Sequence, residues 1–356
     1  MEKLRGGIIG FGHIAAKGHV PGYMFTKGAQ IVAAFDPEPS RAQALSELLP
    51  GARFCHSAEE LFSIQDLDFV DISAPPAFHA GYICRALEHG LHVLCEKPLV
   101  LSLEELEAAA GLAGEKGLVL FTVHNWRHCP IIQEVDWLLA SAGREEAGAG
   151  ADGFGGVRRI VYEVIRTGPS VAVDGPGGAD NWRLDPEISG GGILVDHGWH
   201  AFYLVNQWMG AVPIGIEAGL ENRRFTGLEV EDTASVRLIY PGGREAELFF
   251  TWAGDQRRNT ISIEAAGGRR LLVLDDHIVC EEGVQGGCGR KVLKSFEEGL
   301  SHGSHHPDWY GMVIEEFVAE IRDPGLRGRN LEQASMCLRM LDAARRSALE
   351  GRRIGL

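Results

Sequence analysis

The first third of the chain alternates short apolar runs with segments whose apolar residues recur at helical spacing. This alternation is typical of a parallel sheet covered by helices. The apolar runs predict strands at 7–9, 31–35, 69–73, 92–95 and 119–123. The helical spacing predicts helices at 39–49, 78–88 and 102–116, the last with a capping box of Ser102 and Glu105.

The pattern changes after residue 124. A helix is predicted at 130–139, and residues 140–156, rich in Ala, Gly and Glu, are expected to form a surface insertion. Longer β-type runs and further helical segments follow. They predict strands at 157–166, 214–220, 234–240, 246–252 and 260–265, and helices at 198–209, 309–322 and 331–350. Turn residues at 241–243 and 267–268 predict hairpins.

A chain of 356 residues is too long for one ordinary core. We therefore expect an α/β protein of two domains. Residues 1–124 are expected to form a doubly wound parallel sheet. Residues 125–356 are expected to form an α+β domain with a large open, mainly antiparallel sheet.

Composition limits the partners. The formal net charge of −15 and the lack of a basic stripe argue against a nucleic-acid partner. The seven cysteines form no CxxC pair, which favours reduced thiols over a secreted disulfide framework. No apolar stretch is long enough for a signal core or a membrane span. We expect a soluble, cytoplasmic protein.

A glycine turn follows the first predicted strand and opens a helix. Its sequence is Gly10-Phe11-Gly12-His13-Ile14-Ala15, the GxGxxA pattern of a Rossmann domain that binds a dinucleotide. The first glycine permits the tight turn, and the second lets the backbone approach the pyrophosphate. The helix N-terminus supplies N–H donors to the phosphates. The turn residues 10–14 are therefore candidate cofactor contacts.

Asp36 ends the second predicted strand, where an acidic residue can accept hydrogen bonds from the ribose hydroxyls. Its charge repels a 2′-phosphate, so the sequence favours NAD over NADP. Arg41, a few positions later, is a candidate to neutralise such a phosphate, although a solvated helical arginine is the simpler interpretation.

The fourth predicted strand ends at Glu96-Lys97-Pro98, on the sheet edge where open α/β proteins bind ligands. A lysine at this position can bind a substrate oxygen and stabilise alkoxide character as a hydride leaves carbon. Pro98 is expected to fix the backbone there, in a cis bond if the turn requires one.

The chain resembles the Gfo/Idh/MocA family, named after glucose-fructose oxidoreductase, inositol dehydrogenase and rhizopine catabolism. The resemblance runs over nearly the whole chain, through the glycine turn, Asp36, the segment 74–79, Glu96-Lys97-Pro98, and Gly190-Gly191-Gly192 leading to Asp196 and His200. It implies an oxidoreductase that acts on sugars or cyclitols and assembles as a homodimer or homotetramer. It also implies that Lys97, Asp196 and His200 form the catalytic group.

Physical chemistry supports these roles. Asp196 and His200 stand four residues apart, on one face if that turn is helical. A histidine can take the hydroxyl proton during oxidation and return it during reduction. The resemblance implies further cofactor contacts at Ala74, Pro75, His79, Glu96 and Lys97. It implies substrate contacts at Asn125, Arg127, Trp182, Arg183, Asp196 and His200. Pro76 and Tyr203 depart from the family pattern, where asparagine and aspartate are common.

Other functions remain open at this stage. Histidines at 197 and 200 beside Asp196, and at 302, 305 and 306, suggest a metal enzyme, but the second group lies in a Gly/Ser/Pro-rich loop and we expect no metal. A non-catalytic NAD-binding sensor is a second alternative. An enzyme of the same family that uses NAD transiently to cleave glycosides is a third.

Overall fold

The computed structural model describes the chain from residue 2 to 356, apart from 146–155, 170–180, 267, 285–286 and 304. The chain forms two compact units, and each is built from segments that are separate in sequence. Unit 1 contains Met1–His128, Val171–Gly190 and Ser304–Leu338, and unit 2 contains Cys129–Ser170, Gly191–Gly303 and Arg339–Leu356. The chain first crosses between units close to the expected boundary at 124/125 and then returns to unit 1 twice.

Unit 1 contains a six-stranded parallel sheet in the order β3-β2-β1-β4-β5-β6. This is the Rossmann strand order. The strands are β1 (Leu4–Ile9), β2 (Ala29–Phe35), β3 (Arg53–Cys55), β4 (Phe69–Ile72), β5 (His92–Cys95) and β6 (Leu120–Thr122). The predicted doubly wound sheet is confirmed, and β3 is the strand that the apolar pattern missed.

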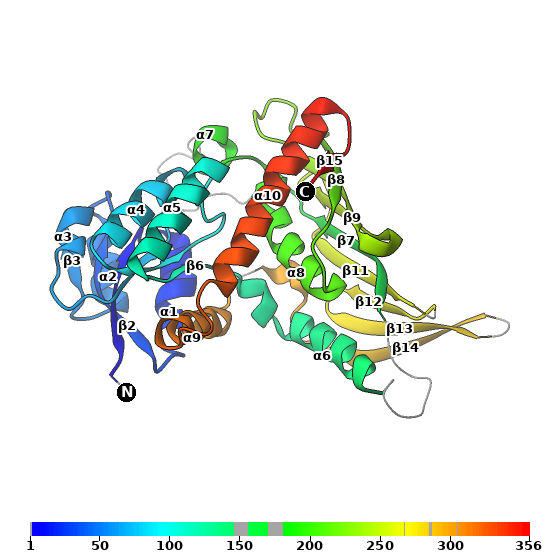
Figure 1. Cartoon of the computed structure of the whole chain (residues 1–356), viewed down its shortest axis with the longest axis horizontal. Helices are drawn as coiled ribbons and strands as arrows, with labels where there is room; N and C mark the ends of the chain where they lie inside the picture. The colour runs from blue at the N-terminus through cyan, green and yellow to red at the C-terminus, as the bar shows by residue number, and fades with distance from the viewer. Residues whose placement is uncertain (1, 146–155, 170–180, 267, 285–286, 304) are drawn as a thin grey trace. The chain divides into compact units, whose positions relative to one another are not determined.

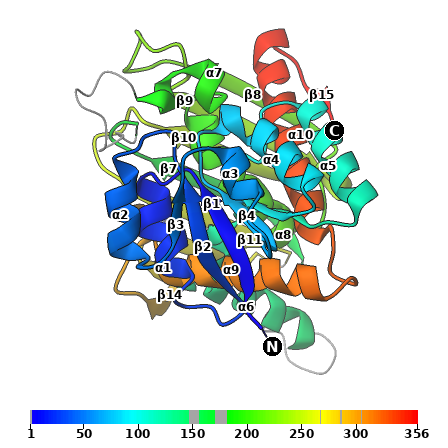
Figure 2. The same ribbon diagram turned by 90° about the vertical axis from the view of Figure 1, so that its left-hand side faces the viewer.

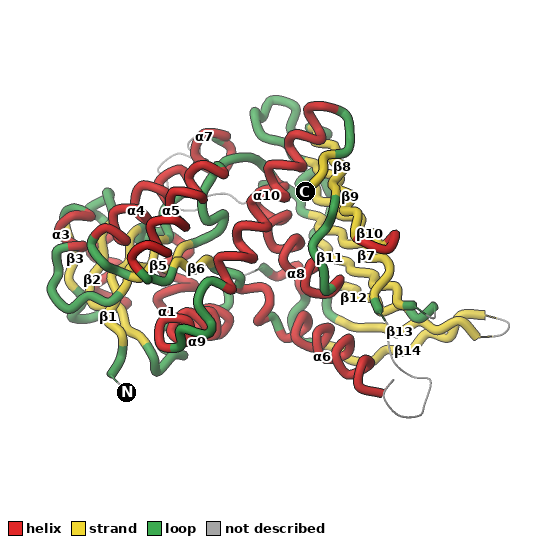
Figure 3. The backbone as a smooth tube through the Cα atoms, viewed as in Figure 1, coloured by secondary structure: helices red, strands yellow, loops and turns green. Residues whose placement is uncertain are grey.

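Helices cover both faces of this sheet (Figures 2 and 3). One face carries α1, α2 and α9, and the other carries α3, α4 and α5. The helices of unit 1 are η1 (Ala15–His19), α1 (Val20–Gly22), α2 (Arg41–Leu48), α3 (Ala58–Phe62), η2 (Pro76–Phe78), α4 (His79–Glu88), α5 (Leu103–Lys116), η3 (Asn125–His128), η4 (Trp182–Leu184), α7 (Pro186–Ser189) and α9 (Pro307–Arg322). The predicted capping box of α5 is present.

A helix from late in the chain completes the core of unit 1. Phe317 on α9 packs edge-on against Phe69 of β4 and Phe121 of β6, with ring centroids 5.5 and 5.7 Å apart. Gly18 permits the approach of α9, because a Cβ there would lie 2.6 Å from the ring of Tyr310. The apolar face of the parallel sheet is therefore closed by residues more than 180 positions after its last strand.

Unit 2 contains a nine-stranded sheet in the order β14-β13-β12-β11-β7-β10-β9-β8-β15 (Figure 1). Every neighbouring pair is antiparallel except β7 with β10. The strands are β7 (Val157–Ile165), β8 (Gly215–Glu221), β9 (Thr233–Tyr240), β10 (Arg244–Thr251), β11 (Arg258–Ala265), β12 (Arg270–Leu274), β13 (His277–Val284), β14 (Gly287–Ser295) and β15 (Ile354–Gly355). The mainly antiparallel sheet and the β9–β10 and β11–β12 hairpins are confirmed; Gly267 of the second turn lies outside the described residues.

The helices of unit 2 lie on one face of the sheet (Figures 1 and 3). They are α6 (Pro130–Glu145), η5 (Leu194–Gly198), α8 (Trp199–Met209) and the last part of α10 (Arg329–Glu350). Two short turns, η6 (Pro241–Gly243) and η7 (Leu300–His302), follow β9 and β14. The expected insertion at 140–156 was partly wrong, because α6 continues to Glu145; alanine propensity extends the helix without an apolar period. The rest of that segment lies outside the described residues, except Gly156.

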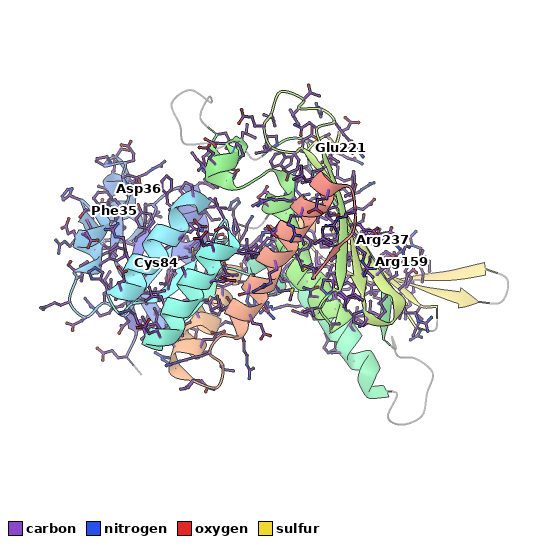
Figure 4. The ribbon with its side chains drawn as sticks, turned by 45° about the horizontal axis from the view of Figure 1, so that its top comes forward. Phe35, Asp36, Cys84, Arg159, Glu221 and Arg237 are labelled. Carbon is purple, nitrogen blue, oxygen red and sulfur yellow. The ribbon has the colours of Figure 1, made fainter. Side chains whose placement is uncertain are left out.

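The opposite face of this sheet carries a row of alternating charges. Ion pairs link Glu217 to Arg237, Arg237 to Glu245 and Glu245 to Arg159. The row continues through Glu264, Arg270, Glu281 and Arg290. It crosses the sheet from β8 to β14, and Figure 4 marks Arg159 and Arg237 within it. No helix in the described ranges is long and apolar enough to cross a membrane.

Candidate functional site

The glycine turn has the geometry of a dinucleotide-binding turn. Gly10 has φ of 86°, and a Cβ there would lie 2.7 Å from the backbone nitrogen of Ala74. A Cβ at Gly12 would meet nothing within 4 Å, which leaves room beside the turn for a phosphate. The helix that follows contains a π-helical turn, η1, in its first part. These residues fit the NAD-binding role that the sequence predicts.

Asp36, labelled in Figure 4, is hydrogen-bonded to this turn. One carboxylate oxygen accepts the N–H of Phe11 at 2.6 Å, and the other accepts the N–H of Glu38 at 2.8 Å. A carboxylate accepts up to about four hydrogen bonds, so both oxygens keep lone pairs for ribose hydroxyls. Arg41 is half-buried at the start of α2.

The segments after β4 and β5 are held together by His79. Its Nδ1 lies 2.9 Å from the carbonyl oxygen of Pro98, and its Nε2 lies 2.7 Å from that of Ala74. Burial lowers the pKa of His79, although both carbonyls and the charge of Glu96 oppose this. His79 therefore joins the predicted cofactor segment at Ala74 and Pro75 to the segment of Lys97. The Lys97–Pro98 bond is cis.

Glu96 belongs to a buried network that the sequence did not reveal. His19 lies between two carboxylates, with Nε2 3.0 Å from Glu96 Oε1 and Nδ1 2.9 Å from Asp71 Oδ2. Tyr310 donates to Glu96 Oε1 at 3.0 Å, and Tyr23 donates to Asp71 Oδ2 at 2.9 Å. The other oxygen of Glu96 accepts the backbone N–H of Lys97 at 3.0 Å. The network therefore ends at the predicted catalytic lysine.

The network is charged at neutral pH. Burial alone would lower the pKa of His19, but Asp71 and Glu96 outweigh it and raise the pKa to about 10. Burial alone would raise the pKa of Glu96, but His19 and Lys97 lower it to about 2. Since an imidazole donates through both nitrogens only when protonated, His19 is an imidazolium between two carboxylates.

The predicted substrate-side residues of unit 1 lie in short 3₁₀ helices. Asn125 and Arg127 belong to η3, and Arg127 donates to Gln333 at 2.8 Å. Trp182 and Arg183 belong to η4, where Cζ of Arg183 lies 4.3 Å from the ring centroid of Trp182. All of these residues belong to the same unit as the glycine turn and Lys97.

The other predicted catalytic residues belong to unit 2. Asp196 lies in the π-helical turn η5, and His200 is buried in the first turn of α8. Single π-helical turns are frequent at functional sites. His200 Nδ1 lies 3.1 Å from the hydroxyl of Tyr203. Through this contact, Tyr203 can orient the imidazole ring of His200.

A glutamate that the sequence analysis missed anchors this helix. The carboxylate of Glu231 accepts the N–H groups of Gly192 and Leu194, both at 3.0 Å. A Cβ at Gly192 would lie 1.9 Å from the carbonyl oxygen of Glu231, so the third glycine of the Gly-Gly-Gly segment is required by this close approach. In the sequence, this role is indicated by an acidic residue shortly before β9.

The structure gathers no metal site within the part of the chain that it describes. His13 packs edge-on against His305 with ring centroids 5.1 Å apart, and His306 stacks on Trp309. Among the described residues, no three His, Cys, Asp or Glu side chains form a group able to hold a metal ion.

Two family models match the chain. The model of the GFO_IDH_MocA oxidoreductase family, with an NAD-binding Rossmann fold, matches residues 4–124. The model of the GFO/IDH/MocA C-terminal domain matches residues 153–270. Together the two matches cover well over half of the chain.

Individual relatives span its full length. An uncharacterized oxidoreductase of Rhizobium meliloti is 28% identical, over 99% of this chain and 98% of that protein. D-xylose 1-dehydrogenase (NADP+) 2 of Haloferax volcanii is 25% identical, over 98% of this chain and 99% of that protein. The solved structure of levoglucosan dehydrogenase with NADH has the same fold, with a TM-score of 0.79, 18% identity and 99% coverage of both chains. The chain thus belongs to the GFO/IDH/MocA family of oxidoreductases, with the family's NAD-binding Rossmann fold at residues 4–124.

Proposed function

We propose that this oxidoreductase transfers a hydride between the nicotinamide of NAD and a hydroxyl or keto carbon of a sugar, sugar derivative or cyclitol. The observation that carries the proposal is the position of Lys97, two residues after the end of β5. The glycine turn follows β1 at the same edge of the sheet, and only β4 separates the two strands. Open α/β sheets bind their ligands at this edge. When bound, NAD supplies the hydride acceptor.

The chain's own residues supply the remaining chemistry. Lys97 donates a hydrogen bond to the reacting oxygen and stabilises the charge that develops there. His200 takes the hydroxyl proton during oxidation and returns it during reduction. When Nδ1–H of His200 donates to Tyr203, Nε2 keeps a lone pair for this proton. Asp196 orients the ring or binds a substrate hydroxyl.

The substrate class rests on the relatives and on the side chains. The relatives include enzymes named for D-xylose and for levoglucosan. Asn125, Arg127, Trp182 and Arg183 offer polar and aromatic groups of the kind that bind polyols. NAD is favoured over NADP because the carboxylate of Asp36 stands at the end of β2, against the glycine turn. We also propose that the chain forms homodimers or homotetramers through the charged face of the unit 2 sheet.

The test is NADH formation over sugars, sugar acids and inositols with the native chain, Lys97→Ala and His200→Ala. We expect both variants to lose turnover while titration calorimetry shows that NAD still binds. Undiminished turnover in the variants would contradict the catalytic roles. A native chain that binds NAD but turns over nothing would favour the sensor, and product release without net NADH would favour glycoside cleavage.

A further inference from the structure

A buried arginine in unit 2 has donors without partners. Arg166 directly follows β7 and is 3% exposed. Its Nη1 donates to Asn259 Oδ1 at 2.7 Å and to the carbonyl of Ile165 at 2.9 Å. Its Nε and Nη2 have no hydrogen-bond partner among the described residues, and neither has Nδ2 of the fully buried Asn259. Three buried donor nitrogens of this cluster therefore have no acceptor among the residues that the structure describes.

The two unpaired donors of Arg166 lie along one edge of its guanidinium. Nε and Nη2 lie on the same side of a guanidinium, and this pair binds the two oxygens of a carboxylate or phosphate in parallel. The arginine accepts nothing, so its contact with Asn259 fixes the amide with Oδ1 toward the guanidinium and Nδ2 away from it. The orientation of both side chains is thus determined by their shared hydrogen bond.

The cluster faces the side of the sheet that carries η5. Along β7, Tyr162 and Val164 are buried beneath the helices, and side chains alternate along a strand, so Arg166 continues this face. Asn259 shares the buried face of β11. The charge of Asp196 acts on Arg166, which places the predicted catalytic aspartate within electrostatic range. Both residues belong to unit 2.

Within the described part of the chain, no carboxylate accepts a hydrogen bond from this guanidinium. The nearby Asp275 directs its oxygens to the backbone N–H of Asn259 and to the N–H and hydroxyl of Ser301. Burial and the like charge of Arg257 lower the pKa of Arg166 to about 10, so it stays protonated at neutral pH. A buried, partly unpaired cation opposes folding, and such groups are retained where a function needs them.

We infer that Arg166 and Asn259 form a subsite for an acidic group of the substrate, a carboxylate or a phosphate ester. The substrate would then be a sugar acid or a sugar phosphate rather than a neutral sugar. This inference rests on the proposed function, because it names the class of substrate held beside Asp196. A free anion would lose its hydration at this shielded position, whereas an acidic group tethered to a bound substrate arrives already positioned.

The test compares matched probes on four proteins. The probes are D-glucose, D-gluconate, D-glucuronate and D-glucose 6-phosphate, each measured for kcat/KM with NAD and for binding to the NAD-loaded protein by calorimetry. The proteins are the native chain, Arg166→Gln, Arg166→Lys and Arg346→Gln. Arg346 is an exposed control on α10 that pairs within its own helix.

We expect the native chain and Arg346→Gln to prefer an acidic probe over glucose. Arg166→Gln should lose roughly 10- to 150-fold in affinity for that probe, the range for hydrogen bonds to charged groups, and little for glucose. Arg166→Lys should recover part of the loss, because it keeps the charge without the paired donors. Which acidic probe binds distinguishes a carboxylate from a phosphate.

The melting temperature separates this role from a structural one. Removing an unpaired buried cation should leave the melting temperature of ligand-free Arg166→Gln unchanged or raised. A lowered melting temperature together with an unchanged acid-to-neutral ratio would overturn the subsite and indicate a buried structural water instead. Calorimetry measures binding of the acidic probe even if no probe is oxidised. A failure of the subsite can therefore be distinguished from a failure of the proposed hydride transfer.

Discussion

At the scale of single residues, the buried charged groups of unit 1 form a network that ends at Lys97. Buried ion pairs contribute little net stability, because desolvation offsets most of the attraction. The arrangement of Asp71, His19 and Glu96 is therefore better explained by positioning. Glu96 fixes the backbone N–H of Lys97, and His19 keeps Glu96 ionised. Lys97 follows directly in the chain, so its orientation depends on this anchor.

Replacing His19 by glutamine should reduce turnover by about 10- to 100-fold with little change in KM, because small displacements of a catalytic group have effects of this size. The stability of the native chain relative to the variant should be pH-dependent. The pKa of His19 is raised from 6.5 to about 10, so its stabilisation is complete below pH 6.5 and is lost as the pH rises through 10. Thermal melts at several pH values measure this.

His92→Gln is the matched control for that variant, since His92 starts the same strand that ends before Glu96. Burial and Arg327 lower the pKa of His92 to about 4. The stability of the native chain relative to His92→Gln should therefore increase as the pH rises from 4 to 6.5, whereas its stability relative to His19→Gln decreases with rising pH. Turnover of His92→Gln should be unchanged. Parallel slopes in the two variants would refute the proposed role of His19.

Asp36 should determine the cofactor. Asp36→Ala removes the charge that repels a 2′-phosphate, so kcat/KM with NADP should rise by at least about 10-fold relative to NAD. Glu38→Ala is the control, because it removes a nearby exposed carboxylate outside the turn. Steady-state kinetics with both cofactors measure the ratio, and a native preference for NADP would contradict the assignment.

At the scale of elements, close contact between helices depends on Gly18. Gly18→Ala should destabilise the protein by about 1–3 kcal/mol, because the added Cβ meets the ring of Tyr310 and α9 has to shift. Gly111→Ala makes the same change inside α5, where a Cβ meets nothing, and should stabilise by about 0.5–1 kcal/mol. Denaturant titrations of both variants give the comparison, and equal effects would rule out the close approach.

The apolar pattern predicted most elements of unit 1, because its buried strands and amphipathic helices carry strong periods. It missed β14 at the edge of the second sheet, because the residues from Gly289 to Ser295 are exposed and show no alternation of apolar and polar positions. It also missed β12 and β13, although their apolar residues are buried. The glycine turn and Lys97 were predictable from short motifs. The contacts of His19 with Asp71 and Glu96 were not, since partners 52 and 77 positions away leave no spacing signal.

At the scale of the whole molecule, the charged face of the unit 2 sheet should pair with a second copy. Its acidic and basic residues alternate, so two copies related by a two-fold axis can place opposite charges against each other. Exposed pairs of this kind add little stability within one chain, which leaves their charges available for an interface.

Light scattering should therefore give a mass at a multiple of 38.7 kDa. The double variant Arg159→Glu/Arg237→Glu should shift the mass toward that of one chain, while Arg346→Glu, on the surface of α10, should leave it unchanged. A native chain that stays monomeric at all concentrations would exclude the assembly.

The late position of α9 also has a consequence for biosynthesis. A ribosome releases the whole parallel sheet long before it makes Tyr310, Val313 and Phe317, which cover one face of that sheet. Until α9 is synthesised, the nascent N-terminal segment exposes the apolar face that α9 later covers. Chaperones bind exposed apolar surfaces of this kind. The region that the family model matches, residues 4–124, lacks α9, so we expect that expressing it alone yields aggregates.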